Sequence, residues 1–211
     1  MALLTHHRLP LASLATHQGL PVAHLASLCG LRPLPSGGGG TTPATPGTIP
    51  APDRYWSFDG TLYDLVDDWY LGPSQGGIEY VADGAVYGQA ARSLVTGTAW
   101  IGLAYADYGS PSRAVVAAWL KNGAFNLGGL IGSEQAGVRT LVVEESSELE
   151  SPISLFALRI GSEDGLTSGQ ADEIAIWLDP PAEWTAAAAA AALSQGDGVV
   201  WRAGQWWEVA E

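Results

Sequence analysis

The most strand-like segment of this chain is Ile174-Ala175-Ile176-Trp177-Leu178, a run of apolar residues that follows the acidic pair Asp172-Glu173. A run of about four to eight apolar residues bounded by turn-forming residues is typical of a strand that is buried in a sheet. The segment therefore predicts an inner β-strand, and the question is what surrounds it.

Similar short stretches recur from Asp53 onward, separated by Gly, Asp and Ser, which is typical of an all-β sandwich. Residues 199–208 predict a closing hairpin. The pattern as a whole indicates an all-β fold, an antiparallel β-sandwich. The further strands that we expect lie at 54–58, 78–81, 99–103, 115–120, 138–143 and 155–160.

One short helix is expected on the C-terminal side of this sandwich. Pro180 and Pro181 precede an alanine run that continues to Ala192 and Leu193, and Gly196 follows it. Alanine has the highest helix propensity, and proline and glycine mark the two ends of a helix. The sequence predicts a helix between these limits.

The N-terminal part contains an internal repeat, because residues 5–15 resemble residues 16–26 at an offset of 11. In each copy a proline opens a Leu/Ala segment that a glycine closes, which predicts short helices near 10–18 and 21–29. Helices of about nine residues are unstable alone in water, so their apolar side needs a surface. Either the protein's own sandwich or a partner could supply that surface.

The segment of residues 35–52, rich in Gly, Thr and Pro, favours a partner, because a spacer separates parts that act apart. We therefore predict an N-terminal anchoring arm of residues 1–34, a linker of residues 35–52 and a sandwich of residues 53–211. The anchoring residues would be Leu9, Leu11, Leu14, Leu20, Val22, Leu25 and Leu28.

The charge is distributed unevenly along the chain. Residues 1–52 contain Arg8, Arg32 and no acid, so all 22 acidic residues but only seven of the nine basic ones follow, a net charge of −15. Such a surface repels phosphate backbones and anionic lipid. We therefore expect no nucleic-acid partner, and no membrane insertion because no run approaches about 20 apolar residues.

Cysteine usage and the N-terminus bear on the compartment. The single Cys29 excludes an internal disulfide framework and a cysteine-based zinc site. His6, His7 and Pro10 interrupt the first apolar stretch, which does not fit an export signal. We expect a protein made in the cytoplasm without a signal peptide.

Four segments, taken in order, resemble the laminin-G-like, concanavalin-type jelly roll: Tyr55–Asp64, Ala114–Lys121, Leu158–Gly161, and Asp172–Trp177 with the helix and Gly196 after it. The resemblance covers about residues 53–197 and implies a jelly-roll sandwich. A Trp-His pair and a Tyr-Val-Asp-Gly turn, usual in that family, are missing between Lys121 and Leu158. Their absence implies a shortened or remodelled sheet there.

The resemblance also implies a structural calcium ion in some members. Asp59 and Asp172 match the positions at which such members supply oxygen ligands. The alternative is that Asp59 caps its own turn and Asp172 begins a strand. No cofactor is required under either interpretation.

Catalysis is not expected. A hydrolase on such a sandwich needs two carboxylates facing each other across a groove, and the acidic clusters at 64–68 and 144–150 have the pattern of loops or solvated edges. All four histidines lie in the arm, away from any nucleophile of the sandwich, so no triad can be assembled. The sequence predicts a protein that is not an enzyme.

The predicted terminal hairpin carries Trp201, Trp206 and Trp207, candidates for contact with a glycan or a protein interface. Alternation along a strand puts Trp206 and Trp207 on opposite faces. One of the two should be exposed unless a neighbour covers it.

Two functions follow from these features. Jelly rolls of this type occur in bacteriophage virion proteins and in sugar-binding modules, and the fold alone does not choose between them. The arm favours a virion-surface protein, a capsid decoration, head-fibre or tail component that binds capsid or tail proteins, forms homo-oligomers such as trimers, and adheres to a cell-surface glycan. The alternative is a carbohydrate-binding module without catalytic activity.

Overall fold

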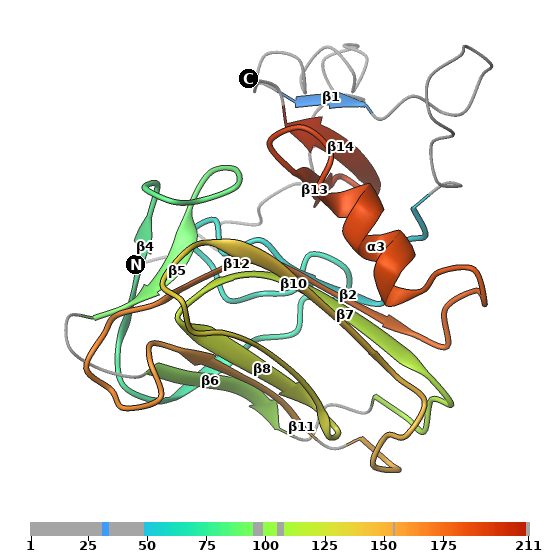
Figure 1. Ribbon diagram of the computed structural model, residues 1–211, viewed down its shortest axis with the longest axis horizontal. Helices are drawn as coiled ribbons and strands as arrows, with labels where there is room; N and C mark the ends of the chain where they lie inside the picture. Colours follow the sequence, from blue (N-terminus) through green and yellow to red (C-terminus); the bar gives the residue numbers. More distant parts are fainter. Residues whose placement is uncertain (1–30, 34–48, 95–98, 105–107, 154, 210–211) are drawn as a thin grey trace, which may run out of the picture.

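The computed structural model describes residues 31–33, 49–94, 99–104, 108–153 and 155–209, which form three packed layers (Figure 1). The elements in chain order are β1 (Leu31–Pro33), β2 (Arg54–Trp56), β3 (Gly72–Gln75), β4 (Ile78–Val81), β5 (Ala90–Ser93), β6 (Ala99–Ala104), β7 (Ala114–Lys121), β8 (Gly123–Leu127), β9 (Leu130–Glu134), β10 (Thr140–Ser146), β11 (Leu155–Ile160), β12 (Gln170–Leu178), α3 (Ala186–Leu193), β13 (Val199–Arg202) and β14 (Gln205–Val209).

The middle layer is a sheet of six strands in the order β10-β7-β12-β5-β4, with β2 paired to β12, and we call it the main sheet. All of its pairings are antiparallel. β12 lies at its centre and contains the run 174–178, so the prediction of an inner strand there is confirmed.

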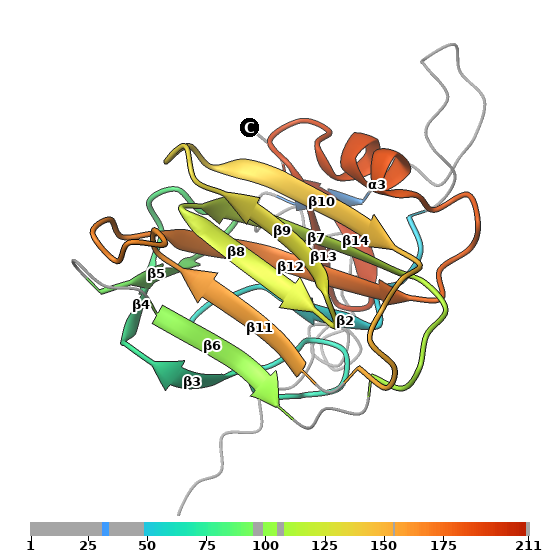
Figure 2. The ribbon, with the colours of Figure 1, turned by 60° about the horizontal axis from the view of Figure 1, so that its bottom comes forward.

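The second sheet packs on one face of the main sheet. Its order is β3-β6-β11-β8-β9, again antiparallel throughout, and Figure 2 shows these strands side by side. The core between the sheets includes Trp56 of β2 and Phe156 of β11, whose rings stack with centroids 5.4 Å apart. Two antiparallel sheets around one core form a β-sandwich, which confirms the predicted fold class.

A third layer covers the other face of the main sheet. It consists of α3 and the small sheet β1-β14-β13, which lie above the main sheet in Figure 1. Its side chains bury the outward residues of β7 and β12, such as Ala117 and Trp177. Strands buried on both faces need apolar residues at every position rather than at alternate ones. This explains the unbroken apolar runs of β7 and β12.

All of the predicted strands are present, most of them with shifted ends. Segments 78–81 and 155–160 coincide with β4 and β11, and the closing hairpin is formed by β13 and β14. Its turn is Ala203-Gly204, with φ of 53° and 79°, as the two positive φ values of a tight hairpin turn require. The predicted helix begins only at Ala186, with Thr185 as its N-cap.

The sequence pattern missed five strands, β1, β3, β5, β8 and β9. The region between Lys121 and Leu158, where a shortened or remodelled sheet was expected, supplies the hairpin β8-β9 and then β10. The second sheet is therefore not shortened in that region. Its strands β8 and β9 were missed because they consist largely of small and polar residues and lack the β-branched runs that are typical of strands.

The predicted arm helices and most of the predicted linker lie outside the described residues. The end of the arm is described as β1, which pairs antiparallel with β14. Residues 49–52 of the predicted linker lie on the body, since Ile49 packs beside the third layer and Pro52 is buried. No helix among the described residues combines the length and the apolar character that crossing a membrane requires.

Candidate binding site

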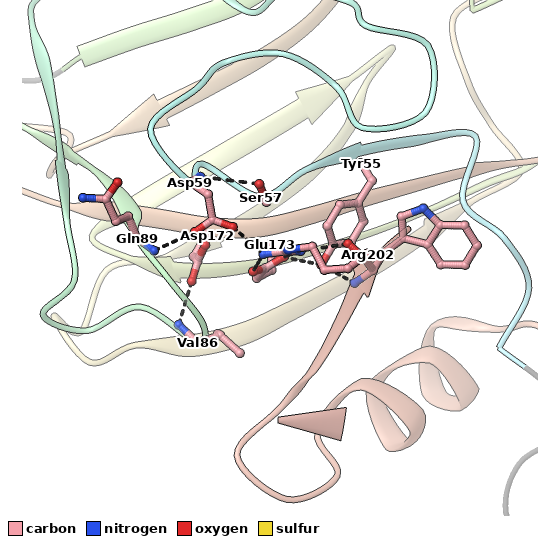
Figure 3. Close-up of polar contacts among 9 residues, drawn as sticks. Tyr55, Ser57, Asp59, Val86, Gln89, Asp172, Glu173 and Arg202 are labelled. Atoms are coloured by element: carbon pink, nitrogen blue, oxygen red, sulfur yellow. Dashed lines mark hydrogen bonds and ion pairs between the residues drawn. The ribbon is translucent and has the colours of Figure 1, made fainter. Parts of the chain in front are cut away.

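A network of buried charges joins the third layer to the main sheet (Figure 3). Arg202, at the end of β13, binds both carboxylate oxygens of Glu173 at 2.7 and 3.0 Å and Asp59 Oδ2 at 2.7 Å. The Tyr55 hydroxyl donates to Glu173 and accepts from the Trp201 backbone N–H. Bidentate arginine–carboxylate contacts of this kind have defined geometry, so the network fixes the hairpin on the sheet.

A β-bulge brings the two adjacent acids into this region. The register between β12 and β7 shifts between Asp172 and Ala175, and Glu173 has φ of 47°. A bulge re-aims side chains that would otherwise alternate between the faces of a sheet. Asp172 accepts from the Val86 N–H at 2.7 Å, and Asp59 accepts from the Gln89 N–H at 2.8 Å.

The protonation of this network follows from burial and from mutual charge. Burial raises the pKa of Asp172 well above its ordinary value, and the charge of Glu173 raises it further. Burial also raises the pKa of Glu173, while Arg202 lowers it. Burial lowers the pKa of Arg202, but Glu173 and Asp59 oppose this, and the pKa rises well above the ordinary value. Arg202 therefore stays charged.

The predicted calcium ligands Asp59 and Asp172 both belong to this network, but the network does not fit an ion. Arg202 supplies the positive charge between the carboxylates, and backbone N–H groups take up Asp59 and Asp172. Asp172 Oδ1 is buried without a hydrogen-bond partner, which is one free oxygen only. Among the described residues no group of three His, Cys, Asp or Glu side chains could hold a metal.

The structure covers all three tryptophans of the hairpin. Their exposed fractions are 9% for Trp201, 7% for Trp206 and 1% for Trp207. Trp206 faces the main sheet beside Trp177, and its indole N–H donates to the Pro50 carbonyl.

Trp207 faces the other way, where Val86 of the β4–β5 loop covers it. The sequence predicted that Trp206 or Trp207 would be exposed unless a neighbour covered it. Neighbours cover both rings, one on each face of the hairpin. The three indoles are therefore packing residues of the third layer and offer no free stacking face.

The acidic clusters named in the sequence include residues with structural partners. Asp64 is fully buried and accepts three backbone N–H groups. Glu145 pairs with Arg113 at 2.9 Å and accepts from the N–H of Ala186 at the start of α3. These two acids hold the fold, and the expectation of no catalysis stays a prediction.

The exposed aromatic residues that the sequence analysis did not single out are Tyr63 and Tyr70. Their side chains are 51% and 46% exposed, and their rings lie 5.0 Å apart, tilted by 45°. An isolated antiparallel bridge joins their backbones. Tyr80 of β4 is half-buried against the core between the two sheets, and its pKa is raised by burial and then by the neighbouring Tyr70. We call Tyr63, Tyr70 and Tyr80 the tyrosine surface.

The loop that carries Tyr63 and Tyr70 is held in one conformation by Asp64. Its carboxylate accepts the N–H of Tyr55 at 2.7 Å, of Val66 at 2.9 Å and of Asp67 at 3.1 Å. Burial raises the pKa of Asp64, and these hydrogen bonds lower it in opposition. A carboxylate with three N–H donors is well satisfied, so the loop is ordered before any ligand arrives.

Arg54 fastens the same loop from outside. Its guanidinium binds Asp67 Oδ2 at 2.5 Å, approaches Asp64 at 3.9 Å and lies over the Trp69 ring at 5.5 Å. The only sign of this site in the sequence is a pair of tyrosines on either side of an acidic turn. The sequence could not show that the turn brings their rings together.

The predicted anchoring residues Leu9, Leu11, Leu14, Leu20, Val22, Leu25 and Leu28 all lie outside the described residues. Their role in binding a particle, and with it the virion hypothesis, stays a prediction.

No protein-family model and no curated protein matches the sequence. Solved structures that are similar include the CBM22-1 xylan-binding domain of Xyn10C from Paenibacillus barcinonensis, with a TM-score of 0.40 and 15% identity over 64% of this chain and 99% of that one. The carbohydrate-binding module CBM36, in complex with calcium and xylotriose, has a TM-score of 0.34 and 17% identity over 50% and 92%.

An exo-β-1,3-galactanase of Phanerochaete chrysosporium, with galactose, has a TM-score of 0.32 and 13% identity over 48% of this chain and 26% of that one. At these identities and TM-scores none of these proteins assigns a ligand to this chain.

Proposed function

We propose that this chain is a non-catalytic carbohydrate-binding β-sandwich whose tyrosine surface holds the glycan. The observation that supports this is the pair Tyr63 and Tyr70, half exposed, with ring centroids 5.0 Å apart on a loop fixed by a buried carboxylate. Exposed aromatic residues gathered at one place mark a binding site more often than scattered ones do.

The chemistry of tyrosine suits a sugar ring. A pyranose has an apolar C–H face and an edge of hydroxyl groups, and tyrosine likewise combines an apolar ring with a polar tip. Asp68 is exposed in the turn between the two tyrosines, and a carboxylate accepts hydrogen bonds from sugar hydroxyls. The same short loop thus supplies exposed aromatic rings and a carboxylate acceptor.

Preorganisation contributes to affinity. Tyrosine has only two side-chain torsions to fix, and the loop is already held by hydrogen bonds to Asp64, so little ordering remains for the ligand to impose. A specific protein interface buries about 800 Å² on each partner. One short loop with Tyr80 beside it suits a few sugar units better than so broad a contact.

The proposal is tested by titrating the full chain and its variants with neutral polysaccharides, including xylan, mannan, galactan and glucan. Tyr63→Ala and Tyr70→Ala should each weaken binding by about tenfold, because losing one stacking ring costs about 1.4 kcal/mol. Tyr63→Phe should bind nearly as well, because it keeps the ring face.

Leu166→Ala is the matched control, since Leu166 is 73% exposed on the β11–β12 loop and should not affect binding. Absence of saturable binding to every polysaccharide, or tyrosine variants that bind like the wild type, would overturn the proposal.

A further inference from the structure

We infer that the tyrosine surface selects uncharged glycans and rejects acidic ones such as uronate or sulfated polymers. This inference rests on the proposed function and specifies its ligand class. It follows from the contacts that the arginines of the body make.

Four arginines of the body are already engaged in ion pairs with carboxylates of the fold. Arg54 pairs with Asp67, Arg92 with Glu79, Arg113 with Glu145, and Arg202 with Asp59 and Glu173, at 2.5 to 2.9 Å. Four of the seven basic residues after position 52 are thereby neutralised within the fold. Recognition of carboxylate or sulfate groups normally uses such guanidinium donors.

Two further arginines direct donors to backbone carbonyls. Arg139 binds the carbonyls of Gly84 and Ala85 at 3.0 and 2.7 Å and lies over the Trp119 ring. Arg159 is 93% buried and binds the Gly161 carbonyl at 3.3 Å. Neither guanidinium belongs to the loop that carries Tyr63 and Tyr70.

At the tyrosine surface itself the local charge is negative. The turn between Tyr63 and Tyr70 contains Asp64, Asp67 and Asp68, and the cation beside it, Arg54, is taken up by Asp67 and lies 3.9 Å from Asp64. The turn carries three carboxylates against one guanidinium, within a body of net charge −15. An anionic sugar bound here would meet uncompensated repulsion.

The substitution Asp68→Asn removes the charge of this exposed residue without disturbing the fold. Asp68 has φ of 60°, and asparagine tolerates this backbone conformation at least as well as aspartate does. Asp67→Asn removes a second charge and releases Arg54 from its ion pair. The double variant Asp67→Asn/Asp68→Asn should therefore bind anionic glycans more tightly than the wild type does. Asp197→Asn, the same chemical change in the turn after α3 of the third layer, serves as the control.

The test uses the full chain and two polymer pairs that share a backbone: methyl-esterified and de-esterified polygalacturonan, and hydroxyethyl and carboxymethyl cellulose, together with the neutral polysaccharides above. At low salt the wild type should bind neutral polymers at least about tenfold more tightly than anionic ones, and salt should reduce this difference. The double variant Asp67→Asn/Asp68→Asn should show a smaller difference in affinity between neutral and anionic polymers, and Asp197→Asn should show the same difference as the wild type.

Equal or tighter binding of the anionic polymers, sensitive to Tyr63→Ala, would overturn the inference while leaving the proposed function intact. Discrimination that is unchanged in the double variant, with an unchanged melting temperature, would also overturn it. Binding of neither kind of polymer would remove the proposed function and the inference together.

Discussion

Arg202 is the residue on which the attachment of the third layer depends most. It is the cation of a network that contains Glu173 and Asp59 and touches Tyr55, and it is mostly buried. Removing one partner of a buried ion pair leaves an uncompensated charge, which costs far more than the pair contributes to stability.

Replacing Arg202 with methionine should therefore lower the free energy of unfolding by about 3–5 kcal/mol, measured by denaturant titration. Arg92→Met is a matched control, because Arg92 pairs with Glu79 at the surface and such pairs contribute about 0–1 kcal/mol. Similar losses in both variants would contradict the assignment of Arg202.

Asp172 should make stability depend on pH. Because burial raises the pKa of its carboxyl, the folded protein keeps a proton that the unfolded chain has already released above the ordinary pKa of 3.8. The folded state binds more protons, so stability falls as pH rises from that value through the raised pKa. In Asp172→Asn this fall should be smaller, which unfolding curves over a pH series would reveal. An identical pH profile in wild type and variant would refute this role.

At the scale of single residues the sequence could identify Asp59 and Asp172 as members of one site, but not the chemistry of that site. The partner, Arg202, lies about thirty residues after Asp172, on a hairpin whose position depends on tertiary packing. The tyrosine surface also depends on tertiary packing, so the sequence does not predict it. An isolated β-bridge joins Tyr63 and Tyr70, and a single bridge leaves no periodic pattern of apolar residues in the sequence.

Among the elements, the loop between β2 and β3 determines how well the tyrosines are presented. Asp64 receives its N–H donors from Tyr55, Val66 and Asp67, so it is a positioning residue that touches no ligand itself.

Asp64→Ala should weaken glycan binding and speed hydrogen exchange of the amides of Val66 and Asp67, whereas Asp64→Asn, which keeps an acceptor oxygen, should do both to a smaller extent. An Asp64→Ala variant with fast exchange but unchanged affinity would show that loop order is not needed for binding.

The strands that the sequence predicted well are those whose burial leaves a simple pattern. β7 and β12 are covered on both faces and appear as apolar runs. β8 and β9 are buried only at alternate positions, but Gly123, Asn126 and Gly132 interrupt the apolar pattern, so their sequences resemble loops. Gly132 is required by packing, since an added Cβ would lie 2.3 Å from the Phe125 ring. Such tertiary constraints are invisible in a single sequence.

For the whole molecule, residues 49–52 of the predicted linker pack on the body. The Pro50 carbonyl accepts the indole N–H groups of both Trp177 and Trp206, at 3.1 and 2.9 Å. This contact ties the chain entering the sandwich to two of its layers.

A shortened chain that begins at residue 53 should therefore be less stable than one that begins at residue 49, by about 2 kcal/mol, because two buried hydrogen bonds contribute about 1 kcal/mol each. Thermal unfolding of the two chains measures this difference. The chain that begins at residue 49 lacks all of residues 1–48, including β1, so its comparison with the intact chain measures the contribution of that whole segment. Equal stability of the two shortened chains would show that residues 49–52 do not stabilise the body and belong to the linker.

The arm of residues 1–34 remains the part of the molecule on which the virion hypothesis depends. If residues 1–34 anchor the protein to a particle, their deletion should abolish association with the particle while the sandwich stays folded. Comparing the solution mass of the intact chain with that of the chain lacking the arm would show whether self-association resides in the arm.

The central claim, that a glycan binds at Tyr63 and Tyr70 and not at the tryptophans of the hairpin, is tested most directly by NMR titration of the wild type with a neutral oligosaccharide that it binds. We predict saturable shifts in the resonances of Tyr63, Tyr70 and Tyr80, with the indole N–H signals of Trp206 and Trp207 unmoved, because these donate to the carbonyls of Pro50 and Arg202. Shifts centred on those indoles, with the tyrosines unaffected, would contradict it.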